Sequence, residues 1–201
     1  MFEWAEPLNR LINELKKIPG IGAKSAQRIS FYILKASLED AHALASAIID
    51  VKEKLKYCSI CNNITDVDPC RICSDDKRDG SILCVVEEPY NVSAIEKTEK
   101  YKGKYHVLLG TISPLQGKGP ENIKIGELVK RVEREGVKEV IIATNPTVEG
   151  EATSQYIIQI LKPFNIKLTR LAIGIPVGSD IDFADQVTIA RAIEGRFEIK
   201  D

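Results

Sequence analysis

Apolar residues in the first third of the chain recur every three or four positions, the spacing of a helix that buries one face. Pro19, Gly20 and Gly22 interrupt this spacing, because proline and glycine favour a tight turn. A third periodic stretch follows, and its apolar side chains favour packing or self-association. We therefore predict helices over residues 8–15, 23–34 and 38–55.

Short apolar runs alternate with helical patterns from residue 81 onward. This alternation is typical of a parallel β-sheet covered by helices on both faces. Strands are predicted over residues 82–86, 105–109, 140–143 and 168–173, and helices over 91–100, 124–135, 152–161 and 182–194. The chain is thus predicted to be α/β, with a helical region (1–56), a cysteine-rich module (57–79), a parallel-sheet domain (80–174) and a C-terminal helical tail (175–201) suited to an oligomer contact.

The bulk composition indicates a globular protein of the cytoplasm. Hydrophobic residues make up 44% of the 201 positions, which is enough to bury a sizeable core. No apolar run approaches the roughly 18 residues of a membrane span. The first ten residues carry acidic side chains where a signal peptide has basic and apolar ones, so we expect no membrane association.

Charge is balanced over the whole chain but not along it. The chain has 28 basic and 29 acidic residues. Between Arg10 and Lys35, however, six basic residues face one acidic residue, a local charge of +5 that leaves −6 on the remainder. A basic head on an acidic body is expected when one end contacts nucleic acid and the other end contacts a different partner.

The turn between the first two predicted helices has the features of a phosphate-binding site. Backbone N–H groups at the start of the second helix attract phosphate oxygens, and Lys24 and Arg28 share one face of that helix. Such contacts grip the backbone without reading bases, so binding is expected to be sequence-independent and salt-sensitive. The alternative is an ordinary helical hairpin, but the pattern Pro-Gly-Ile-Gly-x-Lys-x-Ala resembles the helix-hairpin-helix motif of many DNA repair proteins. The predicted DNA contacts are Lys16, Lys17, Gly20, Gly22, Lys24 and Arg28.

Four of the five cysteines form two CxxC pairs separated by eight residues. Two such turns bring four thiolates onto one ion, so the pattern predicts one structural zinc per chain with a full ligand shell. A pair of disulfides or a redox motif is the alternative, which a reducing compartment disfavours. Cys84 lies in a predicted strand and is expected to be an inert core residue. The predicted zinc ligands are Cys58, Cys61, Cys70 and Cys73.

Acidic residues follow the first and third predicted strands, at the sheet edge where parallel α/β proteins bind ligands. Glu87 follows the first strand, and Glu149 and Glu151 follow the third. This arrangement resembles the Toprim domain of topoisomerases, primases and some nucleases. Asn145 and Thr147, however, stand where that family has aspartates that bind magnesium. We therefore predict a magnesium site that is weak at best and a fold that has lost catalysis.

The alternative for this region is a magnesium-dependent nuclease or topoisomerase-like enzyme that uses Glu87, Glu149 and Glu151. The glycine-rich loop over residues 113–120 lacks the Gly-Lys-Ser/Thr ending of a phosphate-binding loop, so we interpret it as a surface loop. His106 falls within the second predicted strand and is expected to be structural.

The hairpin, the four cysteines, the degenerate acidic site and a Gly-Ile-Pro-Val-Gly segment occur in that order across essentially all 201 residues. In this order the chain resembles the RecR family of bacterial recombination mediators. The resemblance implies a homo-oligomeric ring, a tetramer, that encircles DNA and works with RecO and RecF. It also implies help in loading RecA onto gapped single-stranded DNA, DNA contacts at Lys24 and Arg28, and a basic partner for Glu149 and Glu151.

Overall fold

A computed structural model describes residues 4–198. Residues 1–3 of the predicted range 1–56 and residues 199–201 of the predicted range 175–201 lie outside the described residues. The chain divides into two compact units after Leu55. The helices are α1 (Glu6–Lys16), α2 (Ala23–Lys35), α3 (Leu38–Lys54), α4 (Pro89–Glu96), α5 (Ile125–Arg134), α6 (Val148–Leu161) and α7 (Gln186–Glu194). The strands are β1 (Lys56–Tyr57), β2 (Ile64–Thr65), β3 (Asp79–Val86), β4 (Gly103–Val107), β5 (Glu139–Ile142) and β6 (Lys167–Arg170). Short 3₁₀ turns are η1 (Pro114–Gln116), η2 (Pro120–Asn122), η3 (Lys162–Phe164) and η4 (Ile181–Phe183).

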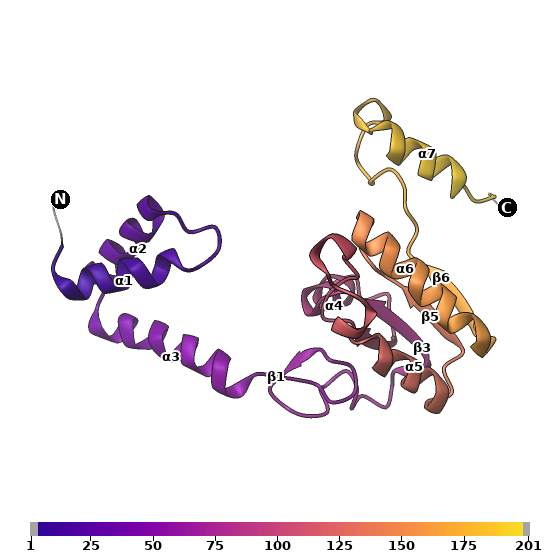
Figure 1. Cartoon of the computed structure of the whole chain (residues 1–201), viewed down its shortest axis with the longest axis horizontal. Coiled ribbons are helices and arrows are strands. Elements are labelled where there is room, and N and C mark those ends of the chain that lie inside the picture. The colour runs from indigo at the N-terminus through magenta and orange to yellow at the C-terminus, as the bar shows by residue number, and fades with distance from the viewer. Residues whose placement is uncertain (1–3, 199–201) are drawn as a thin grey trace. The chain divides into compact units, whose positions relative to one another are not determined.

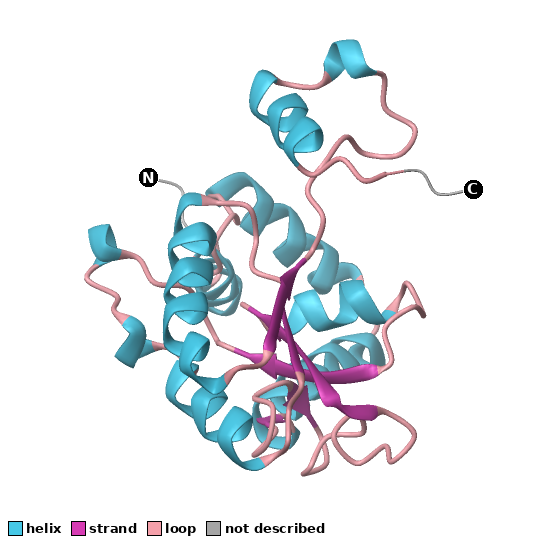
Figure 2. Ribbon diagram, turned by 90° about the vertical axis from the view of Figure 1, so that its right-hand side faces the viewer, coloured by secondary structure: helices cyan, strands magenta, loops and turns pink. Residues whose placement is uncertain are grey.

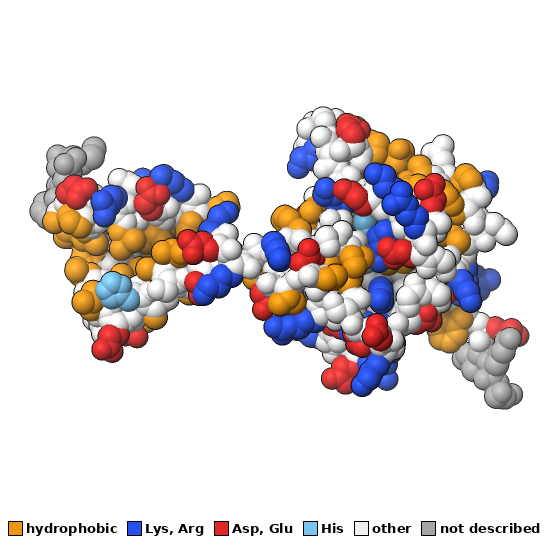
Figure 3. Space-filling model, turned by 90° about the horizontal axis from the view of Figure 1, so that it is seen from below, with side chains coloured by type: hydrophobic (Ala, Val, Ile, Leu, Met, Phe, Trp, Pro, Cys, Tyr) orange, Lys and Arg blue, Asp and Glu red, His pale blue; other side chains and the backbone are white. Residues whose placement is uncertain are grey.

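The first unit is a helical hairpin followed by α3 (Figure 1). The turn between α1 and α2 closes through a hydrogen bond of 3.0 Å from the Ile21 N–H to the Ile18 carbonyl, and Gly20 takes a φ of +83° that favours glycine. Within the described part of this unit only Ala26 and Ser30 are buried. Apolar side chains instead gather on its surface (Figure 3), so this unit has almost no core of its own.

The second unit contains a four-stranded parallel sheet with the order β4-β3-β5-β6, and helices lie on both of its faces (Figure 2). Successive side chains of β3 point to opposite faces of the sheet, so they contribute to two separate apolar clusters. Leu83 and Val85 pack with residues of α5 and α6, whereas Cys84 and Val86 pack with Val92 of α4. The predicted α/β class and two-sided burial are therefore confirmed, as is the core position of Cys84.

Several element boundaries differ from the sequence prediction. Helix α6 begins at Val148 rather than at 152, because the Thr147 hydroxyl caps it by accepting the Gly150 N–H at 3.1 Å. Helix α7 begins at Gln186 rather than at 182, because the Asp185 carboxylate accepts N–H groups of the first turn. Side-chain caps, which periodicity does not register, thus decide where both helices start.

Candidate zinc, DNA-binding and acidic sites

The four predicted zinc ligands converge in the part of the second unit that precedes β3. Their Sγ atoms all lie within 4.8 Å of one another, and all four side chains are buried. In the first CxxC turn, Asn62 takes a φ of +61° and the Cys58 N–H donates to the Asn63 carbonyl at 2.8 Å. The Asp68 carboxylate joins the two turns by accepting the N–H and the hydroxyl of Ser59 at 2.9 and 3.0 Å.

The donor set and its spacing fit one tetrahedral zinc. Zinc–sulfur bonds of about 2.3 Å place sulfur atoms roughly 3.8 Å apart in a tetrahedron, and the Cys61 and Cys70 sulfurs are 3.5 Å apart. That distance is too long for a disulfide, and every cysteine of the chain is free. Burial raises the pKa of the Cys70 thiol to about 11, so a bound dication is what would hold this thiol deprotonated.

The cysteine module is attached to the sheet along β4, an edge strand. The Val107 N–H donates to the Cys61 carbonyl at 2.8 Å, and the Lys104 ammonium donates to the Cys73 carbonyl at 3.0 Å. Ile72 packs against the apolar cluster beneath α4 as well as against the cysteines. The second cysteine of each CxxC pair is therefore anchored to the same strand.

The predicted DNA contacts lie on the helical hairpin. Lys24 and Arg28 are exposed on α2, and neither forms an ion pair within residues 4–198. No side chain caps the start of α2 at Gly22, which leaves its first N–H groups accessible. Lys17 differs, because it forms an ion pair of 2.7 Å with Glu14 that partly neutralises it. The remaining predicted contact on α1, Lys16, is exposed in the last turn of the helix.

Glu87 and Asn145 meet at the carboxyl ends of β3 and β5. Glu87 is 6% exposed; its Oε1 accepts the Asn145 backbone N–H at 2.8 Å, and its Oε2 accepts the Asn145 side-chain amide. Gly150 closes over this pair, and a Cβ there would meet the Asn145 carbonyl and lie 2.7 Å from Glu87 Oε1. Both carboxylate oxygens are thus occupied within a tightly packed site.

These residues do not fit a magnesium ion. Mg²⁺ requires an octahedral set of oxygen ligands with carboxylate charge, whereas Asn145 presents an N–H donor to the only buried carboxylate of this edge among the described residues. Glu151 is held by Arg170 at 2.6 Å, a bond that lowers the pKa of the Glu151 carboxyl. Glu149 is half-buried, and its carboxylate has no hydrogen bond or ion pair among the described residues. The predicted acidic set is therefore brought to one edge but not into one ligand sphere.

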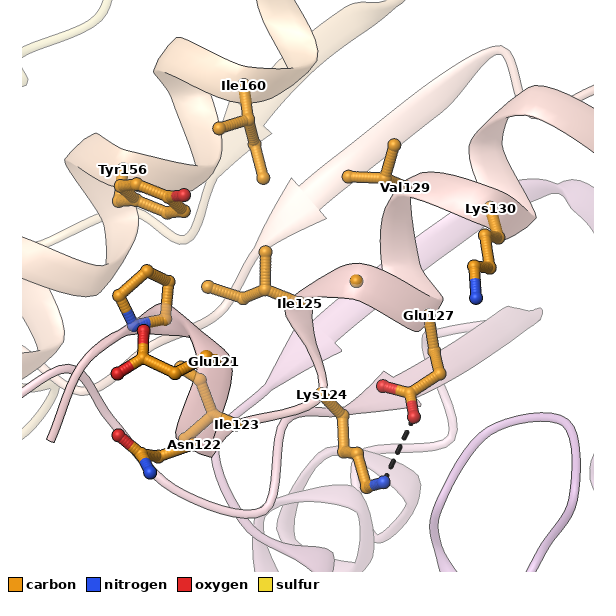
Figure 4. A pocket seen from close by; sticks show the side chains of 12 residues that line it. Glu121, Asn122, Ile123, Lys124, Ile125, Glu127, Val129, Lys130, Tyr156 and Ile160 are labelled. Carbon is orange, nitrogen blue, oxygen red and sulfur yellow. Dashed lines mark hydrogen bonds and ion pairs between the residues drawn. The ribbon is translucent and has the colours of Figure 1, made fainter.

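A hollow of about 560 Å³ that the sequence did not predict lies between η2, α5 and α6 (Figure 4). Tyr156 and Ile160 line one side of it, and Lys124 on the other side is paired with Glu127 at 3.0 Å. None of the predicted site residues lines this hollow. Elements distant in the sequence form it, so only the tertiary structure reveals it.

Residues 4–198 contain no helix with the length and apolar character that crossing a membrane requires.

The chain matches known protein families along most of its length. Residues 8–52 match the family described as RecR, helix-hairpin-helix, and residues 55–75 match the four-cysteine zinc finger domain of RecR. Residues 81–172 match the Toprim domain, and residues 174–196 match the RecR C-terminal family. The match at residues 55–75 agrees with the geometry of the cysteines, which form a structural zinc site.

Full-length relatives are also similar. "Recombination protein RecR" of Koribacter versatilis is 58% identical over 199 residues, which cover 99% of this chain and 100% of that protein. The protein of the same name from Acidobacterium capsulatum is 56% identical over 199 residues, covering 99% of this chain and 100% of that protein. The one from Heliobacterium modesticaldum is 55% identical over 196 residues, with 98% of each chain covered.

Proposed function

Because the chain belongs to the RecR family of recombination proteins, we propose that it is a non-catalytic clamp on DNA. It acts with RecO and RecF to help load RecA onto gapped single-stranded DNA. The observation that carries this proposal is the pair Lys24 and Arg28, exposed and without ion-pair partners among the described residues, on a helix whose start is open to phosphate. We further propose a cytoplasmic location, since chromosomal DNA lies there in bacteria.

The contacts proposed for DNA are of the kind that bind phosphate rather than bases. Lys24 and Arg28 lie one turn apart, and the free N–H groups at the start of α2 lie beside them. Such contacts release counterions from the nucleic acid, so affinity falls steeply as salt rises and depends little on sequence.

Replacing both residues tests the DNA assignment. The double variant Lys24→Ala/Arg28→Ala should bind duplex DNA at least about tenfold more weakly at low salt, and the slope of log affinity against log salt should decrease by about two. Fluorescence anisotropy with a labelled duplex measures both quantities. The matched control is Lys97→Ala/Lys100→Ala, which removes two exposed lysines from the second unit. Unchanged affinity of the first variant at low salt would contradict the proposal.

We propose that the acidic edge, which comprises Glu87, Glu149 and Glu151 at the carboxyl ends of β3 and β5, performs no chemistry. A general acid–base carboxylate needs a free oxygen near its substrate, whereas Glu87 is buried and bonded through both oxygens to Asn145. Supercoiled plasmid incubated with the protein and Mg²⁺ is expected to remain supercoiled. Nicking or relaxation that Glu87→Gln abolishes would favour the enzyme instead.

We also propose that the chain forms a tetramer, and two exposed apolar surfaces support this proposal. The α3 surface is defined by Leu44, Ile48, Ile49 and Val51, and the tail surface is defined by Val177, Ile181, Phe183 and Val187. Apolar patches of this kind mark protein–protein contacts. A chain with two different self-complementary surfaces pairs with one copy through each, and four copies close into a ring when the two twofold axes are perpendicular.

The acidic edge is the proposed contact for RecO. Glu149 has a carboxylate without a partner in the described chain, whereas Glu151 is already paired with Arg170. A basic partner is therefore expected to contact Glu149 first. Glu149→Gln should weaken RecO binding in a titration and leave DNA binding unchanged.

A further inference from the structure

Tyr32 is an exposed aromatic residue on the cationic face of α2. Its side chain is 73% exposed, and within residues 4–198 it has no hydrogen bond and no ring contact. Tyr32 follows Arg28 by four positions and Lys24 by eight, a spacing that keeps all three on adjacent turns of one helix face. Lys35, in the last turn, extends the same face.

Two shallow, open depressions adjoin Tyr32. Hollows of about 310 and 490 Å³ lie against α2, and Arg28 and Tyr32 line both of them. The neighbouring Phe31 is used differently, because its ring packs edge-on against Trp4 at 5.1 Å. Phe31 thus stabilises the hairpin, whereas the ring of Tyr32 remains available to a ligand.

We propose that Tyr32 is a base-stacking platform that gives this protein a preference for single-stranded over duplex DNA. The proposal rests on the DNA binding proposed above. Bases in a duplex are already stacked on both faces, so an exposed ring gains nothing from them. Unpaired bases offer their faces to aromatic side chains, and cations beside the ring hold the backbone. Arg28 and Lys35 supply those cations.

Affinity for two forms of one sequence tests this role. Tyr32→Leu, which keeps an apolar side chain without a ring, should weaken binding to a single-stranded oligonucleotide about tenfold, within the range for loss of one stacked base. Binding to the duplex of equal length should change less than about twofold, and the salt dependence should not change. Tyr32→Phe should retain the single-strand affinity of the natural protein. Anisotropy titrations at one salt concentration measure the affinities, and a salt series measures the slope.

The control is Tyr90→Ala. Tyr90 is 67% exposed, but its four neighbours on either side include no lysine or arginine and include Glu87 and Glu88. Its replacement should leave both affinities unchanged.

Three outcomes would overturn the proposal. Equal loss on both forms of DNA would make Tyr32 a general contact, and no loss on either would remove it from the interface. A change in native mass of Tyr32→Leu would assign the ring to a contact between subunits. These results differ from failure of the proposed function, in which the natural protein and Lys24→Ala/Arg28→Ala bind both forms equally poorly.

Discussion

At the scale of single residues, the contact between Glu87 and Asn145 changes what the acidic edge is. The side-chain amide of Asn145 donates a hydrogen bond to a carboxylate that, opposite an aspartate, would need a cation or a proton to relieve repulsion between charges. The two hydrogen bonds from Asn145 to Glu87 therefore hold the ends of β3 and β5 together.

Gly150 should be intolerant of any side chain. A Cβ at this position would overlap the Asn145 carbonyl and approach Glu87 Oε1 to 2.7 Å. Gly150→Ala should lower the free energy of unfolding by about 1–3 kcal/mol, as overpacking of a rigid site does. Urea denaturation measures the change.

The control for that variant is Gly126→Ala. Gly126 lies in α5, where an added Cβ meets nothing within 4 Å. Alanine is the better helix former by about 0.5–1 kcal/mol, so this variant should be neutral or more stable. Equal behaviour of the two alanine variants would show that the fit around Gly150 is not constraining.

His106 is a buried polar residue of the edge strand β4. Its Nε2 lies 2.7 Å from the Lys124 carbonyl, and its Nδ1 lies 3.5 Å from Arg131 Nη1. Burial, and to a lesser degree the charge of Arg131, lower the pKa of His106 from 6.5 to about 4. The ring is therefore neutral at physiological pH, as the structural role predicted from the sequence requires.

The lowered pKa of His106 predicts acid sensitivity. His106 binds a proton at about pH 6.5 in the unfolded chain and only near pH 4 in the folded chain. The stability that the neutral His106 ring contributes is therefore fully present above pH 6.5 and is lost as the pH falls between these values. The loss should be roughly 3 kcal/mol. Urea denaturation across this range measures it.

Carboxylates with lowered pKa values affect the free energy of unfolding in a lower pH range than His106 does. The Glu151 carboxyl, for example, contributes stability that is lost only as the pH falls below its ordinary value of 4.5. His106→Gln should flatten the dependence between pH 6.5 and 4.5, and His42→Gln, at an exposed position, should not. A natural protein with constant stability over that interval would contradict the assignment.

At the scale of elements, the cysteine module acts as a cover for β4. An edge strand with free N–H and C=O groups invites pairing with other chains. Here the Cys61 carbonyl accepts the N–H of Val107 at 2.8 Å, and Lys104 reaches Cys73. The zinc site therefore supports the sheet as well as its own loops.

Removal of zinc should loosen β4 selectively. After chelation, the Val107 amide is expected to exchange with deuterium at least about tenfold faster, because its acceptor belongs to a loop whose fold depends on the metal. The Ala143 amide, which donates to the Val85 carbonyl at 2.8 Å inside the sheet, is the internal control. Hydrogen exchange by NMR reads both sites. Equal protection of the Val107 amide with and without zinc would show that the stability of β4 does not depend on the cysteine module.

At the scale of the whole molecule, the distribution of apolar surface argues for assembly. The first unit buries few side chains within its described residues, although its helices carry many apolar positions. A small unit without a core gains stability by burying such positions against another copy. The tetramer proposed above buries the α3 surface of this unit and, in a separate contact, the tail surface of the second unit.

Charged substitutions should divide the assembly in two steps. Ile48→Glu in the α3 surface and Phe183→Glu in the tail surface should each convert tetramers into dimers, and the combined variant should be monomeric, because burying an unpaired charge prevents each contact. Native mass spectrometry gives the subunit number. Leu115→Glu, at a 98% exposed position in η1, is the control and should leave the mass of the assembly unchanged.

The sequence by itself determined the order and type of the main elements, the four zinc ligands and the basic face of α2. These features depend on local spacing: helical periodicity, the short reach of a CxxC turn, and side chains four residues apart on one helix. The short β1–β2 pair was not predicted, because two-residue strands carry no periodic signal.

Only the tertiary structure decided how distant residues meet. It joined Asn145 to Glu87 across 58 positions, attached the cysteine module to β4, and left the ring of Tyr32 exposed while Phe31 packed against Trp4. The physical reason is that these contacts depend on sheet order and on which faces become buried. Both arise from the packing of the whole chain, and local spacing encodes neither.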